Sequence, residues 1–87
     1  MTENEVLERV RRKVGAFNEE GRFTPRLQVP ENGIRLDGEW YYVIVQPVAE
    51  PRSSYDYYNA LSEIEEEIEH DLEPEGVNVL IVPVLPG

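Results

Sequence analysis

Cysteine is absent from the 87 residues of this chain, and no apolar run approaches the roughly 18 residues of a membrane-spanning helix. Without cysteine the protein has no disulfides, no thiolate metal ligands and no thiol nucleophile. Such a chain suits a reducing compartment, so we expect a cytoplasmic location. The N-terminal segment MTENEVLERV lacks the continuous apolar stretch of a signal peptide, and we expect no membrane partner.

Basic residues are scarce in the second part of the chain. Residues 1–35 carry seven basic and six acidic side chains, whereas residues 36–87 carry Arg52 against twelve acidic ones. The net charge of the whole chain is −10. Phosphate backbones and anionic membranes repel such a protein, so we expect no nucleic-acid partner, although a basic protein partner is compatible with this charge. The basic segment RVRRK at residues 9–13 is best explained as a helix surface, and its role stays open.

Length limits the chain to a single domain, residues 1–87, because two hydrophobic cores do not fit. A chain this short buries roughly 60–65% of its unfolded surface, which leaves a modest margin of stability. Association with further copies adds buried surface, so short chains gain most from forming oligomers.

The N-terminal segment has the capping and periodicity signals of a helix. Thr2 is followed three residues later by Glu5, the spacing of a capping box. A helix is therefore predicted at about residues 3–19. Its apolar side chains recur at helical spacing, at Val6, Leu7, Val10, Val14 and Phe17.

A second helix is predicted from about residue 54 to Leu72, where a proline and a glycine follow. Ser53 and Asp56 repeat the capping spacing, with Ser54 as a rival cap. One face of this helix is an apolar stripe, and we expect it to lie in the core. Its members are Tyr57, Leu61, Ile64, Ile68 and Leu72.

Four β-prone segments complete the pattern. Asp37-Gly38 between two such segments is a strong hairpin signal, and we expect the first three strands to follow one another as hairpins. The last strand follows the second helix, at a length suited to a right-handed parallel crossover. We predict an α+β fold, a small mixed β-sheet with two helices in the order α-β-β-β-α-β. The strands are predicted near residues 25–29, 33–37, 39–47 and 77–84.

Both long strands are apolar on both sides. Trp40, Tyr42 and Ile44 alternate with other apolar residues, and the last strand has the same pattern. Strands of this kind are usually buried on both faces. If the two helices cover opposite faces, the monomer is complete; if they share a face, the other face needs a second subunit. The sequence does not decide between these arrangements, and we expect a homodimer.

Carboxylates crowd the second helix, in the run EIEEEIEHDLEPE at residues 63–75, which also holds the only histidine. Glu67 and His70 have the Glu-x-x-His spacing that di-iron sites use in two copies, together with two further glutamates. Here the motif occurs once, on the side of the helix away from the apolar stripe. We therefore expect a solvated face with no bound metal and no cofactor.

No constellation of catalytic residues stands out. General acid–base chemistry needs a carboxyl group in a cleft, where burial or a nearby like charge raises its pKa. A solvated helix face offers no such cleft, and Ser53 and Ser54 are better explained as caps than as nucleophiles. We predict no catalytic residues, and a small enzyme with a site at a subunit interface stays as an alternative.

Aromatic side chains suggest a contact surface, because tyrosine and tryptophan combine apolar area with a polar group. We predict a small acidic, non-catalytic protein-interaction module that self-associates. An alternative is an acidic inhibitor or nucleic-acid mimic that presents the helix carboxylates to a basic partner. The residues predicted for the contact surface are Trp40, Tyr42, Tyr55, Tyr58, Glu63, Glu66, Glu67 and His70.

Overall fold

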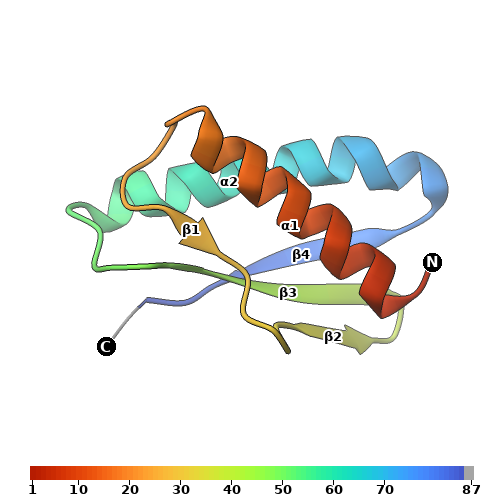
Figure 1. Ribbon diagram of the computed structural model, residues 1–87. Coiled ribbons are helices and arrows are strands. Elements are labelled where there is room, and N and C mark those ends of the chain that lie inside the picture. Colours follow the sequence, from red (N-terminus) through yellow and green to blue (C-terminus); the bar gives the residue numbers. More distant parts are fainter. Residues whose placement is uncertain (86–87) are drawn as a thin grey trace.

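A four-stranded sheet carries two helices on one of its faces in the computed structural model, which describes residues 1–85 (Figure 1). The predicted α+β class and the order α-β-β-β-α-β are confirmed. A short 3₁₀ turn at Glu73–Glu75 separates the second helix from the last strand. The elements are α1 (Glu3–Glu19), β1 (Leu27–Gln28), β2 (Ile34–Asp37), β3 (Trp40–Pro47), α2 (Ser54–Leu72) and β4 (Asn78–Pro83).

Both helices begin at the predicted caps. The Thr2 hydroxyl accepts a hydrogen bond from the Glu5 amide at 3.2 Å, and the Glu5 carboxylate accepts one from the Thr2 amide at 3.4 Å. At α2 the Ser53 hydroxyl accepts from the Asp56 amide at 3.3 Å, so Ser53 is the cap. Gly76 ends the turn after α2 with a φ of +74°, a conformation that glycine adopts without steric cost.

The long strand β3 lies at the centre of the sheet. It pairs antiparallel with β2 and parallel with β4, as the crossover length predicted. Strand β1 pairs antiparallel with the last two residues of β3. The amides of Ile44 and Val48 donate to the carbonyl oxygens of Gly33 and Arg26, so β1 and β2 follow each other along the same edge of β3. Strand β4 occupies the opposite edge.

This arrangement corrects the expected succession of hairpins, because β1 pairs with β3 and not with β2. The turn at residues 30–33 carries the chain onward along β3 instead of reversing it. Its amide at Gly33 donates to the Pro30 carbonyl at 3.0 Å. A Cβ atom at Gly33 would lie 2.8 Å from the Pro30 ring, so this close turn requires glycine.

The two helices lie side by side on the same face of the sheet (Figure 1). The apolar stripe predicted for α2 is buried against the sheet and α1, and Tyr57 of this stripe is fully buried. The Tyr57 hydroxyl is 2.9 and 2.8 Å from the carbonyl oxygens of Val45 and Val84, which joins α2 to the sheet. The fold therefore has two layers. The largest fully buried side chains are Tyr57, Phe17, Ile64, Ile68, Leu72, Val6, Val10, Val43, Val45 and Val79.

Candidate contact surface

The face of the sheet opposite the helices is covered by no other segment of residues 1–85 (Figure 1). Alternate residues of β3 and β4 point to this side, while Val43 and Val79 point into the core. Trp40 is 42% exposed and Leu80 is 38% exposed. We call this surface the open face, and its apolar members are Trp40, Tyr42, Ile44, Leu80 and Val82.

Cross-strand pairing sets the open face in rows. Trp40 lies between Asp37 of β2 and Asn78 of β4, and Tyr42 lies between Arg35 and Leu80. In the next row Ile44 lies beside Val82. The guanidinium of Arg35 stands 5.8 Å from the centre of the Tyr42 ring, within the range of a cation–π contact.

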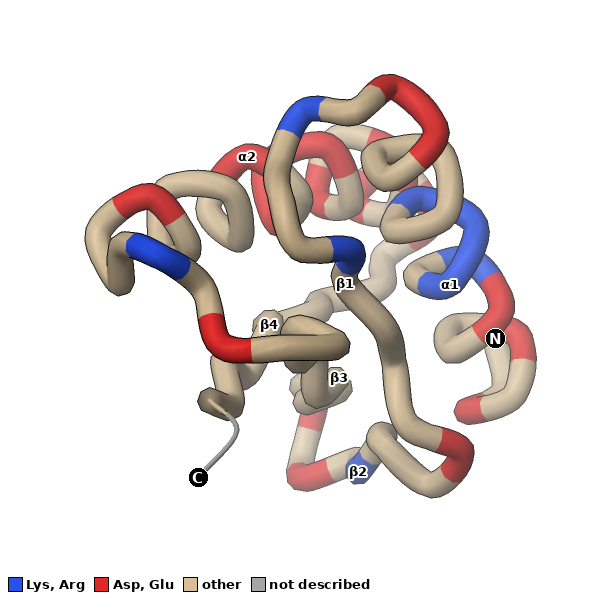
Figure 2. The backbone as a smooth tube through the Cα atoms, turned by 60° about the vertical axis from the view of Figure 1, so that its left-hand side comes forward, with Lys and Arg blue, Asp and Glu red and all other residues tan. Residues whose placement is uncertain are grey.

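Charge is nearly absent from the open face. Its strand positions carry one cation, Arg35, and one anion, Asp37, in a protein with a net charge of −10. Figure 2 shows the acidic residues gathered along α2, while β3 and β4 carry almost no charge. The open face is therefore the part of the molecule where a second negatively charged protein meets the least repulsion.

A shallow hollow of about 440 Å³ lies on the open face beside β2. Its walls are mostly apolar, and Arg35 is the only charged residue among them. No carboxylate, histidine or serine converges on it from the residues that line it, so it lacks the parts of an acid–base or nucleophilic site. Its shape and polarity suit an apolar side chain of a partner. The lining residues are Asn32, Gly33, Ile34, Arg35, Tyr42, Ile44 and Val82.

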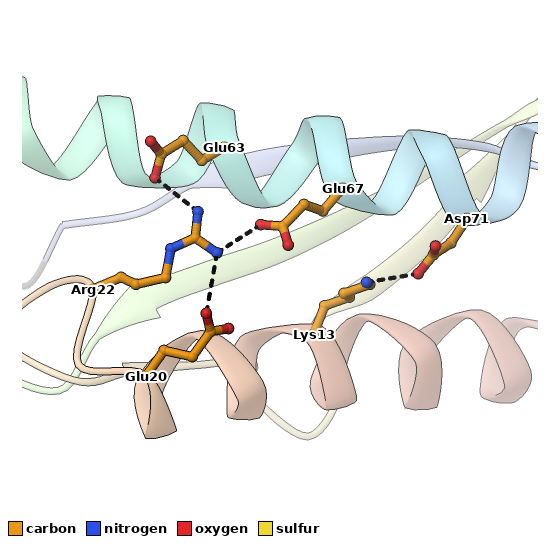
Figure 3. A network of polar contacts seen from close by, with 6 residues as sticks. All are labelled: Lys13, Glu20, Arg22, Glu63, Glu67 and Asp71. Atoms are coloured by element: carbon orange, nitrogen blue, oxygen red, sulfur yellow. Dashed lines mark hydrogen bonds and ion pairs between the residues drawn. The ribbon is translucent and has the colours of Figure 1, made fainter.

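The carboxylates of α2 are in part neutralised within the chain (Figure 3). Arg22, in the segment after α1, donates to Glu67 at 3.1 Å and to Glu63 at 3.3 Å. Glu20 lies 3.8 Å from the same guanidinium. The Glu67 carboxylate therefore pairs with Arg22 of its own chain, which opposes its use as a metal ligand together with His70. Residues 1–85 contain no cluster of three or more histidine or acidic side chains arranged around a common centre.

A second set of ion pairs closes the far end of the helix layer. Lys13 of α1 lies 2.9 Å from Asp71 of α2, and its hydrogen bond lowers the pKa of that carboxyl group (Figure 3). Arg9 lies 3.2 Å from Glu75 in the turn that follows α2. Part of the basic segment at residues 9–13 thus holds the two helices together.

The residues predicted for the contact surface fall on two separate parts of the molecule. Trp40 and Tyr42 lie on the open face, whereas the other six lie on α2 in the helix layer. Tyr55 is 75% exposed near the start of α2, and Tyr58 is also exposed there. Glu63, Glu66 and His70 are exposed, and Glu67 is half-buried against Arg22.

Sequence reasoning placed no charged residue on the open face, although Arg35 and Asp37 lie there. The signal that could have found them is the Asp-Gly turn. It fixes the register of β2 against β3 and so places alternate residues of β2 beside Trp40 and Tyr42.

Comparisons with known proteins add no further information. No protein-family model matches the chain, and searches of curated proteins and of solved structures found no match. Neither helix of residues 1–85 has an apolar stretch long enough to cross a membrane. Function must therefore be inferred from the surfaces of the chain itself.

Proposed function

We propose that this protein is a small, non-catalytic interaction module, and that a second copy of the chain covers its open face. The observation that carries the proposal is that both helices cover the same face of the sheet. They leave Trp40 and Leu80 exposed and Tyr42 partly exposed. An exposed apolar patch of this kind on a small protein marks a contact site. A cytoplasmic location fits the absence of cysteine.

Charge supports a second copy as the occupant. Two molecules with a net charge of −10 repel each other at long range, so their contact must be apolar and locally neutral at its centre. The open face meets both conditions, because its only charges are Arg35 and Asp37. Two-fold pairing, in which each copy presents the same surface, is the commonest form of such association.

The ion pairs of α2 weigh against an acidic mimic that binds a basic partner. Glu63, Glu67 and Asp71 already bind cations of the same chain, so a partner would have to compete with them. Pairing within the chain also breaks up the continuous negative surface that a mimic needs. An enzyme with a site at the interface is less well supported still, because the hollow on the open face has no acid or base in its lining.

A lysine on the open face tests the proposal. Leu80→Lys introduces a charge at the centre of the contact, and we expect the dimers that the protein forms at micromolar concentration to dissociate. Light scattering measures the mass. The emission of Trp40, the only tryptophan, reports burial of the open face by a shift to shorter wavelength as dimers form.

The matched control is Tyr55→Lys, which replaces an exposed aromatic residue of the helix layer with the same charge. This variant should associate as the unmodified chain does. A mass of one chain for the unmodified protein at every concentration would contradict the proposal. So would dissociation in Tyr55→Lys alone.

A further inference from the structure

The two outer edges of the sheet are built differently, and the edge at β4 is blocked along its second half. The Val84 amide donates to the Val45 carbonyl oxygen of β3. Even-numbered residues of β4 therefore direct their backbone groups toward β3, and the odd-numbered residues direct theirs outward. The carboxylate of Glu65, from α2, accepts the outward amide of Ile81 at 2.9 Å. Pro83, the next outward position, has no amide hydrogen. Occupied donors and prolines are how proteins prevent a further strand from adding to an edge.

The edge at β2 has no such protection. The Ile44 amide donates to Gly33 at 2.7 Å, which fixes the alternation along β2. Arg35 and Asp37 therefore direct their backbone groups toward β3, and Ile34 and Leu36 direct theirs outward. No other strand of residues 1–85 pairs with this edge. Leu36 is also 45% exposed, so an apolar side chain stands beside the unpaired backbone groups.

We propose that two copies of the chain join their β2 strands antiparallel about Leu36, so that the two sheets become continuous. The sequence of β2, Ile-Arg-Leu-Asp, is self-complementary in this register. Leu36 lies opposite Leu36 of the other copy. Arg35 of each copy lies opposite Asp37 of the other, and opposite charges directly across a strand pair stabilise it. The outward amide and carbonyl of Leu36 exchange two hydrogen bonds across the two-fold axis.

Neighbouring registers are less favourable. Pairing centred on Arg35 sets two guanidinium groups directly opposite each other, which destabilises a strand pair. Pairing displaced by a single residue on one strand sets outward backbone groups of one copy against groups that are already bonded to β3. Of these registers, the one about Leu36 satisfies the charges and the hydrogen bonds together.

The edge contact uses the outward backbone groups of β2, which the open-face contact does not use, although Arg35 and Asp37 border both contacts. It extends the proposed function. Antiparallel pairing of two edge strands has its two-fold axis perpendicular to the sheet, so the two open faces come to lie next to each other. Each can still be covered by a further copy. Because β2 is only four residues long, edge pairing is the weaker contact, and it joins dimers into closed assemblies of four chains at higher concentration.

Amide hydrogen exchange tests the edge contact at the residue concerned. The Leu36 amide is unpaired in the single chain and becomes hydrogen-bonded in the pair. Its exchange should therefore slow by at least about tenfold between micromolar and millimolar concentration. The Ile81 amide is the internal control, because Glu65 holds it within the chain and its exchange should not change with concentration. Unchanged rapid exchange of Leu36 at millimolar concentration would overturn the proposal.

Charge-exchange variants test the register. R35D and D37R should each fail to pair with themselves, because each sets like charges opposite each other. An equimolar mixture of the two should pair, since the carboxylates of one then face the guanidinium groups of the other. The double variant R35D/D37R should pair with itself. The readout is the exchange of the Leu36 amide. If this exchange slows at millimolar concentration in each single variant as much as in the mixture, the register about Leu36 is wrong.

A proline substitution in β2 distinguishes the edge contact from the open-face contact. L36P removes the outward amide without breaking a bond to β3, whereas L36T shortens the apolar side chain and keeps the amide. L36P should keep the open-face dimer intact and abolish the assembly of four chains. L36T should retain the four-chain assembly to a greater extent than L36P does. Four-chain assembly in L36P overturns the edge contact only. A dimer that persists in Leu80→Lys overturns the open-face contact only, so the two proposals can fail separately.

Discussion

Tyr57 illustrates how one residue ties the layers of this small protein together. Its ring is fully buried between α2 and the sheet, and it lies 6.1 Å from the ring of Phe23. Its hydroxyl reaches the carbonyl oxygens of Val45 and Val84. The sequence predicted Tyr57 as one more member of the apolar stripe. The hydrogen-bonding role of its hydroxyl depends on residues far along the chain, which no local pattern reveals.

Tyr57→Phe should lower the free energy of unfolding by about 1–3 kcal/mol, because it leaves the Val84 carbonyl without its partner. The Val45 carbonyl still accepts the Val84 amide. Urea unfolding followed by circular dichroism measures the change. The matched control is Tyr58→Phe at the exposed neighbouring tyrosine, and an equal loss there would contradict the role given to Tyr57.

The same hydroxyl makes stability depend on pH in the alkaline range. Burial raises the pKa of Tyr57 above its ordinary value, so the unfolded chain releases this proton at a lower pH than the folded chain does. The stabilisation is complete below pH about 10 and is lost as pH rises through the folded pKa. Stability should therefore fall above that pH in the unmodified chain and fall less steeply in Tyr57→Phe. Parallel curves for the two proteins would contradict this assignment.

The helices were predictable because their signals are local. Caps, periodicity and stop signals all lie within a few residues of the helix that they define, and α1 begins and ends where it was predicted. The pairing of β1 was not predictable in this way. It depends on the close turn between Pro30 and Gly33, and the sequence alone suggested an ordinary hairpin there.

The outward face of α2 was only partly predictable for a related reason. The angles around the helix predicted both Glu63 and Glu67 to be solvent-exposed, and Glu63 is exposed whereas Glu67 is half-buried against Arg22. Their partner Arg22 is more than forty positions away in the sequence, and only the packing of the two helices brings it close. The acidic face of α2 is therefore partly an intramolecular contact with the segment after α1 and only partly a solvated surface.

Ile64→Ala tests the orientation of α2 as an element. Ile64 is almost fully buried, and its truncation should lower the free energy of unfolding by about 2–5 kcal/mol, a large share of the stability of a domain this small. Glu66→Ala on the exposed side of the same helix should change stability by less than about 0.5 kcal/mol. The midpoints of urea unfolding compare the two. Equal midpoints for Ile64→Ala and the unmodified chain would mean that the helix is turned the other way.

The sequence of the whole chain leaves undecided which faces of the sheet the two helices cover. The right-handed connection from β3 through α2 to β4 puts α2 on one determined face. No such rule governs α1, because it precedes the first strand and has no parallel partner strand to return to. Its apolar stripe fits either face, so the sequence could state the consequence of each arrangement but could not choose between them.

Salt should strengthen self-association if the open face is the contact. At low ionic strength the net charge of −10 on each copy opposes the approach of a second copy, and an apolar, nearly neutral contact gains nothing from charge. Raising the salt concentration from about 0.1 M to 1 M shortens the screening length from about 10 Å to about 3 Å, which weakens the repulsion. The dimer should therefore persist to lower protein concentration in high salt, as measured by light scattering. Leu80→Lys, with the same change of salt, should stay a single chain at micromolar concentration. Weaker association in high salt would instead mean that attraction between the basic N-terminal part of one copy and the acidic remainder of another holds the dimer.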